Sequence, residues 1–335
     1  MNRIDYIDNS KVIAIYLVVL AHTQLYTPLT NWIYVFHMPL FFFISGFLFS
    51  YDRNPSLKEF AVKRFKQLVI PYISFNIISY IFWLSVTRYV GIEGADPVEW
   101  YSPMVNALLC NGPKMIHNVP LWFLLCLFIV ELSYYILFRN KDKKIQCQLL
   151  LLFFVVGYLN YKFNPIRLPF SIGTAMVAIV FYGIGKLLQP YIHRMRFNVL
   201  FFLICFMATL IVSEYNGRIN MHDNYYNNYL LFFTGAFFGI HLLMSIGYIL
   251  SRVFNSSKIL QYISQNTLII CSVHLLTFSF MKGIMVYVLN IPIDYLYQKI
   301  LLNMVFALVS ITICLPIIFI IKKYMPFLIG CKKII

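Results

Sequence analysis

Long apolar runs follow one another along almost the whole chain, and they limit its fold more than any other feature of the sequence. A transmembrane helix needs about 20 consecutive, mostly apolar residues. Only 12% of the 335 residues are charged, whereas soluble domains contain about 25%. We therefore predict an all-α polytopic membrane protein with about ten transmembrane helices, in which residues 1–335 form a single domain. The predicted spans cover 12–26, 32–49, 68–86, 119–138, 147–160, 170–188, 197–212, 229–250, 262–289 and 299–321.

The basic residues are distributed unevenly among the segments that connect these spans. Most of the 27 Lys and Arg residues fall in every second connection and in the two terminal segments. Cytoplasmic segments are enriched in Lys and Arg, so we expect both termini to be cytoplasmic, as an even number of spans requires. Topology and contact with membrane lipid headgroups then explain the net charge of +15, and we expect no nucleic-acid partner.

The first predicted span pairs a cation with a titratable ring. Lys11 and His22 are eleven positions apart, a rotation of about 1100° that puts them on one helical face, roughly 16 Å apart along the axis. An ionisable group inside the bilayer usually faces a cavity or a partner. We therefore expect Lys11 at the cytoplasmic edge and His22 near mid-membrane, with both side chains pointing into one passage.

The second predicted span contains the sequence YVFHMPLFFFISGFLF, residues 34–49. We expect His37 to begin this helix on the outer side, with Pro39 in the first helical turn, where its missing N–H costs little. Gly46 is expected to allow close contact between helices. A membrane histidine often serves only as a hydrogen-bonding group between helices, so His37 also has a purely structural interpretation.

Two further polar residues lie in predicted spans. His274, near the middle of the ninth span, is the third candidate histidine. Glu131 is the clear acid of the fourth span, and we expect it to be paired with a cation for structural reasons. The seven cysteines are scattered without the spacing of a metal or redox motif, so no metal site is predicted.

A basic cluster precedes the third predicted span in the sequence KEFAVKRFKQLVIPY. Lys63 and Lys66 are one helical turn apart, with Arg64 between them. Clustered cations bind phosphates through charge and hydrogen bonds, so this cluster predicts a cytoplasmic site for a polyphosphorylated ligand. Membrane topology and headgroup contact are the alternative explanation. No glycine-rich phosphate loop is found, so ATP is not supported as a donor.

Five of these features, taken in order, resemble the membrane-bound acyltransferase 3 family. They are the pair Lys11-x10-His22 and the stretches FHMPLFFFISGF, KRFKQLVIPY, LWFLLCLFIVEL and LIICSVHLL. The N-terminal IDYIDNSKVIAIYLVVLAH is most similar to the branch named for fucose 4-O-acetylase. The resemblance covers essentially the whole chain. It implies a multi-pass enzyme of the inner (cytoplasmic) membrane that moves an acyl group, usually acetyl, from cytoplasmic acyl-CoA to a hydroxyl group of an extracytoplasmic glycan or lipid-linked sugar.

By position, the resemblance makes His22 the essential histidine and Lys11 its basic partner. The paired arginines of the family correspond to Lys63 and Lys66, and this doubled lysine departs from the family pattern. We expect His22 to act as a general base on the acceptor hydroxyl or to carry the acyl group itself. The predicted catalytic residues are His22, His37 and His274, and the predicted acetyl-CoA-binding residues are Lys11, Lys63, Arg64 and Lys66.

Two other functions are compatible with parts of the sequence. A transporter or flippase of lipid-linked sugars would also use broken helices and membrane histidines, although no duplicated half of the chain is visible. A non-catalytic receptor or assembly partner would tolerate the loss of His22. The sequence does not predict the acceptor sugar, the modified hydroxyl, the acyl chain or the oligomeric state.

Overall fold

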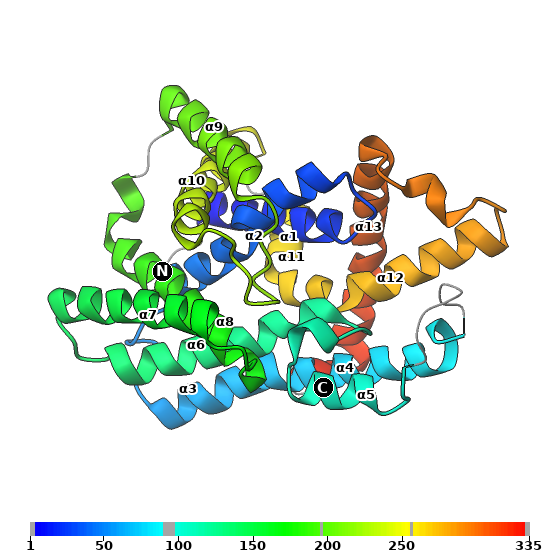
Figure 1. The fold of residues 1–335 in the computed structure, drawn as a ribbon, viewed down its shortest axis with the longest axis horizontal. Coiled ribbons are helices and arrows are strands. Elements are labelled where there is room, and N and C mark those ends of the chain that lie inside the picture. Colours follow the sequence, from blue (N-terminus) through cyan, green and yellow to red (C-terminus); the bar gives the residue numbers. More distant parts are fainter. Residues whose placement is uncertain (1–3, 90–97, 195–196, 255–256, 332–335) are drawn as a thin grey trace. The chain divides into compact units, whose positions relative to one another are not determined.

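The computed structural model of the protein describes residues 4–89, 98–194, 197–254 and 257–331. Within these ranges the chain is helical (Figure 1), and apart from an isolated bridge between Asn220 and Tyr225 it forms no β-structure. The all-α prediction is confirmed. The chain folds into two compact units, each made of segments that are far apart in sequence. Unit 1 comprises Met1–Phe49, Phe181–Met221 and Tyr225–Ile318, and unit 2 comprises Ser50–Val180, His222–Asn224 and Phe319–Ile335.

The helices of the described residues account for the predicted spans. Nine of the helical stretches are long and apolar enough to cross a membrane, which confirms a polytopic membrane protein. The α-helices are α1 (Asp5–Ala21), α2 (Thr27–Leu48), α3 (Leu57–Arg64), α4 (Ile70–Phe82), α5 (Ser102–Leu108), α6 (Trp122–Phe138), α7 (Lys143–Phe163), α8 (Ile172–Leu188), α9 (Val199–Asn216), α10 (Tyr229–Val253), α11 (Lys258–Gln265), α12 (Thr267–Tyr287) and α13 (Ile300–Tyr324).

The first helix differs from its prediction at both ends. α1 begins at Asp5 and contains only 17 residues, and His22 is its C-cap residue. The predicted span 12–26 is therefore wrong at both boundaries. The predicted span runs on to Tyr26 across the polar residues His22, Thr23 and Gln24, whereas the helix ends with the apolar run, at Ala21. His22 consequently lies at the end of a helix, next to a turn, and not within a helix that continues.

The second helix begins earlier than predicted. α2 starts at Thr27 because Pro28 occupies its first turn, where the fixed φ and the missing N–H of proline suit a helix start. His37 therefore lies in the middle of α2, and the predicted position at the start of the helix is wrong. Pro39 is an internal proline of α2, so its predicted place in the first turn is wrong as well.

Glycines set the spacing between the central helices of unit 1, where α10 packs against both α1 and α2 (Figure 1). A methyl group added to Gly247 of α10 would lie 2.2 Å from the hydroxyl oxygen of Ser10 in α1. One added to Gly239 would lie 2.2 Å from the Cβ atom of Phe36 in α2. Membrane helices associate mainly through close packing of this kind, because lipid is as apolar as their side chains.

The contact expected at Gly46 is confirmed. A methyl group on this residue of α2 would lie 1.8 Å from the carbonyl oxygen of Tyr182 in α8. The contact is reciprocal, since a methyl group on Gly185 of α8 would lie 2.1 Å from the carbonyl oxygen of Phe43. The two helices therefore touch backbone to backbone, and neither glycine position has room for a side chain.

We predict that Gly46→Ala lowers the stability of the detergent-solubilised protein. Its methyl group meets main-chain atoms of Tyr182, which cannot rotate away, and overpacking of this kind costs about 1–3 kcal/mol. Gly283→Ala in α12 is the matched control, because nothing lies within 4 Å of its added carbon. Thermal unfolding followed by tryptophan fluorescence should give a lower midpoint for Gly46→Ala only. Equal midpoints for the two variants would contradict the backbone contact.

In unit 2, the basic cluster of Lys63, Arg64 and Lys66 lies within a helix, whereas the sequence predicted it in the segment before the helix. The stretch Leu57–Thr87 is helical over 31 residues, and its first turn is capped by Ser56, whose side chain accepts a hydrogen bond from the N–H group of Glu59. A π-helical segment, Phe65–Val69, interrupts the α-helical geometry two residues before Pro71. Proline removes one backbone hydrogen bond from a helix, and single π-turns often occur at functional sites.

Candidate active site

Three histidines of unit 1 come together although they are far apart in sequence. His22 is at the end of α1, His37 in the middle of α2 and His274 in α12. The ring centroids of His22 and His274 are 5.2 Å apart, with the rings inclined at 68°. His22 also interacts electrostatically with both other histidines. The three predicted catalytic residues therefore form one cluster around His22.

The same local contact fixes the orientation of each ring. Nδ1 lies within hydrogen-bonding distance of the carbonyl oxygen four residues earlier, at 2.7 Å for His22, 2.8 Å for His37 and 3.0 Å for His274. A carbonyl oxygen only accepts, so Nδ1 must carry the proton. In the neutral ring Nε2 then keeps its lone pair, which is the form that acts as a base or a nucleophile.

The three rings differ in burial. The His274 side chain is 0% exposed and that of His37 is 5% exposed, whereas His22 is only half-buried. His22 is therefore the member of the cluster that a ligand reaches most easily. Within the described ranges, no three His, Cys, Asp or Glu side chains are arranged to hold a metal ion, these histidines included.

Lys11 lies on the same helix as His22. α1 is uninterrupted from Lys11 to Ala21, so the spacing that puts the cation and the ring on one helical face is preserved. The hydroxyl group of Ser264 donates a 2.5 Å hydrogen bond to the carboxylate of Asp8. This bond ties the first half of α1 to α11 and so fixes the helix that carries both residues.

A basic pocket opens in unit 2. Its volume is about 610 Å³, and its lining residues are Lys58, Glu59, Val62, Lys63, Lys66, Gln67, Gly330 and Cys331. Two of the four predicted acetyl-CoA-binding residues, Lys63 and Lys66, thus line one cavity. Lys58 was missed by the sequence analysis, although it belongs to the same basic run. Three ammonium groups and one carboxylate give the pocket a net positive charge, which suits an anionic ligand.

The chain near its C-terminus closes one side of this pocket. The short helix η8 (Pro326–Ile329) ends in Gly330, which has a φ of +67°. A methyl group on Gly330 would lie 1.9 Å from the carbonyl oxygen of Lys66. Glycine is therefore needed here both for its left-handed conformation and for the close approach. No sequence pattern predicts the contact between Lys66 and Gly330, because the two residues are far apart in the chain.

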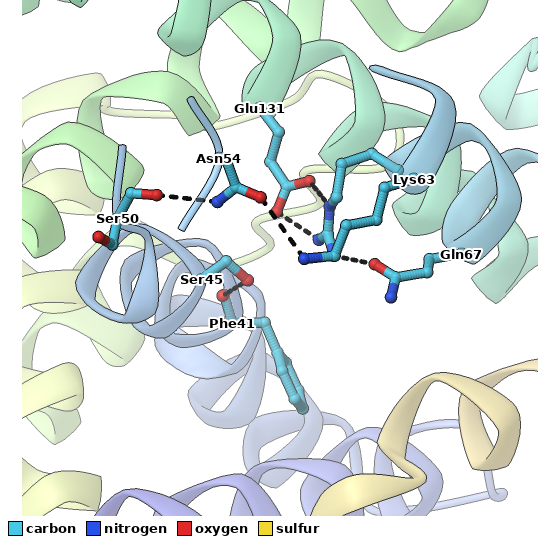
Figure 2. A network of polar contacts seen from close by, with 8 residues as sticks. Phe41, Ser45, Ser50, Asn54, Lys63, Gln67 and Glu131 are labelled. Atoms are coloured by element: carbon cyan, nitrogen blue, oxygen red, sulfur yellow. Dashed lines mark hydrogen bonds and ion pairs between the residues drawn. The ribbon is translucent and has the colours of Figure 1, made fainter. Parts of the chain in front are cut away.

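Arg64 is engaged within the protein and is not among the residues that line the pocket. Its guanidinium group forms a two-point ion pair with Glu131, whose side chain is 4% exposed, and donates a 2.6 Å hydrogen bond to Gln67. Figure 2 shows Lys63 and Asn54 beside Glu131, and Lys63 donates a hydrogen bond to Asn54 at 3.4 Å. The structural pairing predicted for Glu131 is confirmed.

Comparison with known proteins gives one match. The model of the acyltransferase 3 family, described as an acyltransferase domain, matches residues 4–322. That range includes all seven predicted site residues and most of both units. No curated protein and no solved structure gives a significant match to the chain.

Proposed function

Because the chain belongs to the acyltransferase 3 family, it is a membrane acyltransferase, and we propose that it moves an acetyl group from cytoplasmic acetyl-CoA to a hydroxyl group of an extracytoplasmic surface polysaccharide or its lipid-linked precursor. One observation carries most of this proposal. The half-buried ring of His22 has its Nδ1 held by the carbonyl oxygen of Val18 at 2.7 Å, which puts the lone pair of the neutral ring on Nε2, the atom that would act as a base toward a hydroxyl group.

The proposed reaction uses His22 as the general base. Its Nε2 removes the proton of the acceptor hydroxyl while the hydroxyl oxygen attacks the thioester carbonyl carbon. The carbon–sulfur bond then breaks, and the CoA thiolate takes the proton back from His22. The ring of His274 contacts that of His22 edge-on at 5.2 Å, and His37 is proposed to help orient the acceptor. The protein's own contribution is thus proton transfer at one nitrogen and the orientation of that nitrogen.

The basic pocket of unit 2 is the proposed site for the phosphate groups of CoA. Lysine binds phosphate as a compact charge with three donors, and Lys58, Lys63 and Lys66 line the cavity together. Arg64 holds this part of the helix in place through Glu131. Lys11 is proposed to bind the donor as well, because it shares the helix of His22.

We predict that the double variant Lys63→Ala/Lys66→Ala raises the KM for acetyl-CoA. Losing charged hydrogen bonds of about 1.5 kcal/mol corresponds to a rise of about tenfold or more, while kcat at saturating donor changes little. The matched control is Lys141→Ala/Lys144→Ala, which removes the same charge from exposed residues outside the pocket. Steady-state kinetics in detergent would measure the difference. An unchanged KM in the first variant would remove the pocket from the proposal.

Transfer itself can be tested with purified protein and radiolabelled acetyl-CoA. The acceptor is the surface glycan isolated from cells that lack this protein, and mass spectrometry locates the new acetyl groups. We expect label in the glycan. Label on the protein in the absence of glycan would assign the acyl-carrier role to a side chain instead of the base mechanism. A protein that translocates lipid-linked sugar but transfers no acetyl group would contradict the proposal.

A further inference from the structure

The turn that follows α1 contains one buried polar atom without a hydrogen bond and lies near two others. In the described part of unit 1, Nε2 of His274, Oε1 of Gln24 and Oδ1 of Asn303 are buried and make no hydrogen bond. The His274 and Asn303 side chains are both 0% exposed. Buried polar groups in native proteins are nearly always satisfied, so these three atoms need an explanation.

Contacts within unit 1 connect the three residues. The side-chain amide of Asn303 donates a 3.2 Å hydrogen bond to the backbone carbonyl oxygen of Gln24. Gln24 follows His22 by two positions, and the His22 ring lies 5.2 Å from that of His274. The helices α12 and α13, which carry His274 and Asn303, meet through the rings of Phe278 and Phe306 at 5.2 Å. The three atoms therefore lie in one region, around the turn that contains His22 and Gln24.

All three unsatisfied atoms are hydrogen-bond acceptors. The amide oxygens of Gln24 and Asn303 can only accept. Nε2 of His274 also accepts, because its Nδ1 carries the proton that bonds to Ile270 at 3.0 Å. A ligand that satisfies them must therefore bring donors. An ammonium group is a poor candidate, because these neutral acceptors provide no anion to offset the desolvation of a buried cation. Hydroxyl groups remain. Water supplies them one molecule at a time, whereas a sugar carries several in a fixed arrangement.

We propose that Gln24, Asn303 and His274 form the binding site for the hydroxyl groups of the acceptor sugar. We call this site the acceptor track. In it, the amide oxygens of Gln24 and Asn303 orient neighbouring hydroxyl groups of the sugar so that the reacting hydroxyl faces His22. The inference rests on the proposed function for the identity of the acceptor. It adds Gln24 and Asn303, which no motif singled out, as residues that determine acceptor affinity.

The test compares Gln24→Met with wild-type protein. Methionine keeps the length of the side chain and removes its acceptor oxygen, while both hydrogen bonds to the Gln24 backbone carbonyl, from Asn303 and from the N–H group of Gln298, are retained. The control is Gln298→Met, the same change at an exposed residue next to the track. Binding of glycan from cells that lack the protein is measured by calorimetry without acetyl-CoA, and acceptor and donor KM values are measured with it.

We expect Gln24→Met to weaken glycan binding and raise the acceptor KM by about 2- to 12-fold, the effect of one lost hydrogen bond. The donor KM and the behaviour of Gln298→Met should match wild type. Equal glycan affinity of wild type and Gln24→Met, or no glycan binding by wild type, would overturn the acceptor track. Weakened binding by Gln24→Met, in a wild-type protein that binds glycan but transfers no acetyl group, would overturn the proposed function and leave the track in place.

Discussion

His22→Ala will reduce acetyl transfer to the glycan by about 10²- to 10⁴-fold, the usual contribution of a positioned general base. Alanine removes the Nε2 lone pair and leaves the hydroxyl proton without an acceptor. His274 does not take over, because its ring is held by the bond of Nδ1 to the Ile270 carbonyl oxygen at 3.0 Å, and in the acceptor track its Nε2 faces a neighbouring hydroxyl group and not the reacting one. Radiolabel transfer by purified protein, at equal protein concentration, measures the loss.

His241→Ala is the control for this loss. His241 is a histidine of α10, also in unit 1, whose ring packs against Phe201 at 4.5 Å, and it has no part in the proposed chemistry. The His22→Ala protein should reach the membrane in wild-type amounts, because His22 is the C-cap residue of α1 and is only half-buried. Transfer at the wild-type rate by His22→Ala would remove the catalytic assignment. An equal loss of acetyl transfer in His241→Ala would indicate that both substitutions act by disturbing the fold and not by removing a catalytic group.

Hydropathy predicted where the helices lie but not where they end. The apolar runs correspond to the helical spans because lipid leaves no water to hydrogen-bond an exposed backbone. Helix ends depend instead on local backbone chemistry. Because Pro28 lies in the first turn, α2 starts at Thr27, earlier than hydropathy predicts. His37 therefore lies at the centre of the helix and not at its predicted start. The π-helical segment at Phe65–Val69 likewise has no hydropathy signature.

The candidate site could be predicted only in part, because it is assembled from distant segments. The spacing of Lys11 and His22 on one helix is a local property and was readable from the sequence. The approach of His274 to His22 depends on how α12 packs against α1, and pairwise packing has no periodic signal. The same holds for Gly330 beside Lys66 and for Asn303 beside Gln24. Lys58 in the basic run and Gln24, two residues after His22, could have been found from the sequence.

We expect the largest loss of stability from a change that breaks the ion pair of unit 2. Glu131→Leu leaves the guanidinium group of Arg64 without its carboxylate partner, in a place where the Glu131 side chain is 4% and the Arg64 side chain 21% exposed. Removing one partner of a buried pair typically costs about 3–5 kcal/mol, because the remaining charge stays desolvated. Thermal unfolding in detergent should show a lower midpoint, and the basic helix should lose the support on which donor binding depends.

The double variant Arg64→Met/Glu131→Leu separates two effects on stability: the net contribution of the ion pair, and the destabilisation caused by a buried charge without a partner. Replacing both partners by apolar side chains of similar volume is often neutral or stabilising, so the double variant should recover most of the stability lost in Glu131→Leu. Its KM for acetyl-CoA then reports whether Arg64 itself contacts the donor. If Arg64 only positions the helix, this KM stays within about threefold of wild type, whereas a rise of about tenfold indicates a direct contact with CoA. A double variant as unstable as Glu131→Leu would contradict the account, because the instability would then come from lost packing at the two positions and not from a charge without its partner.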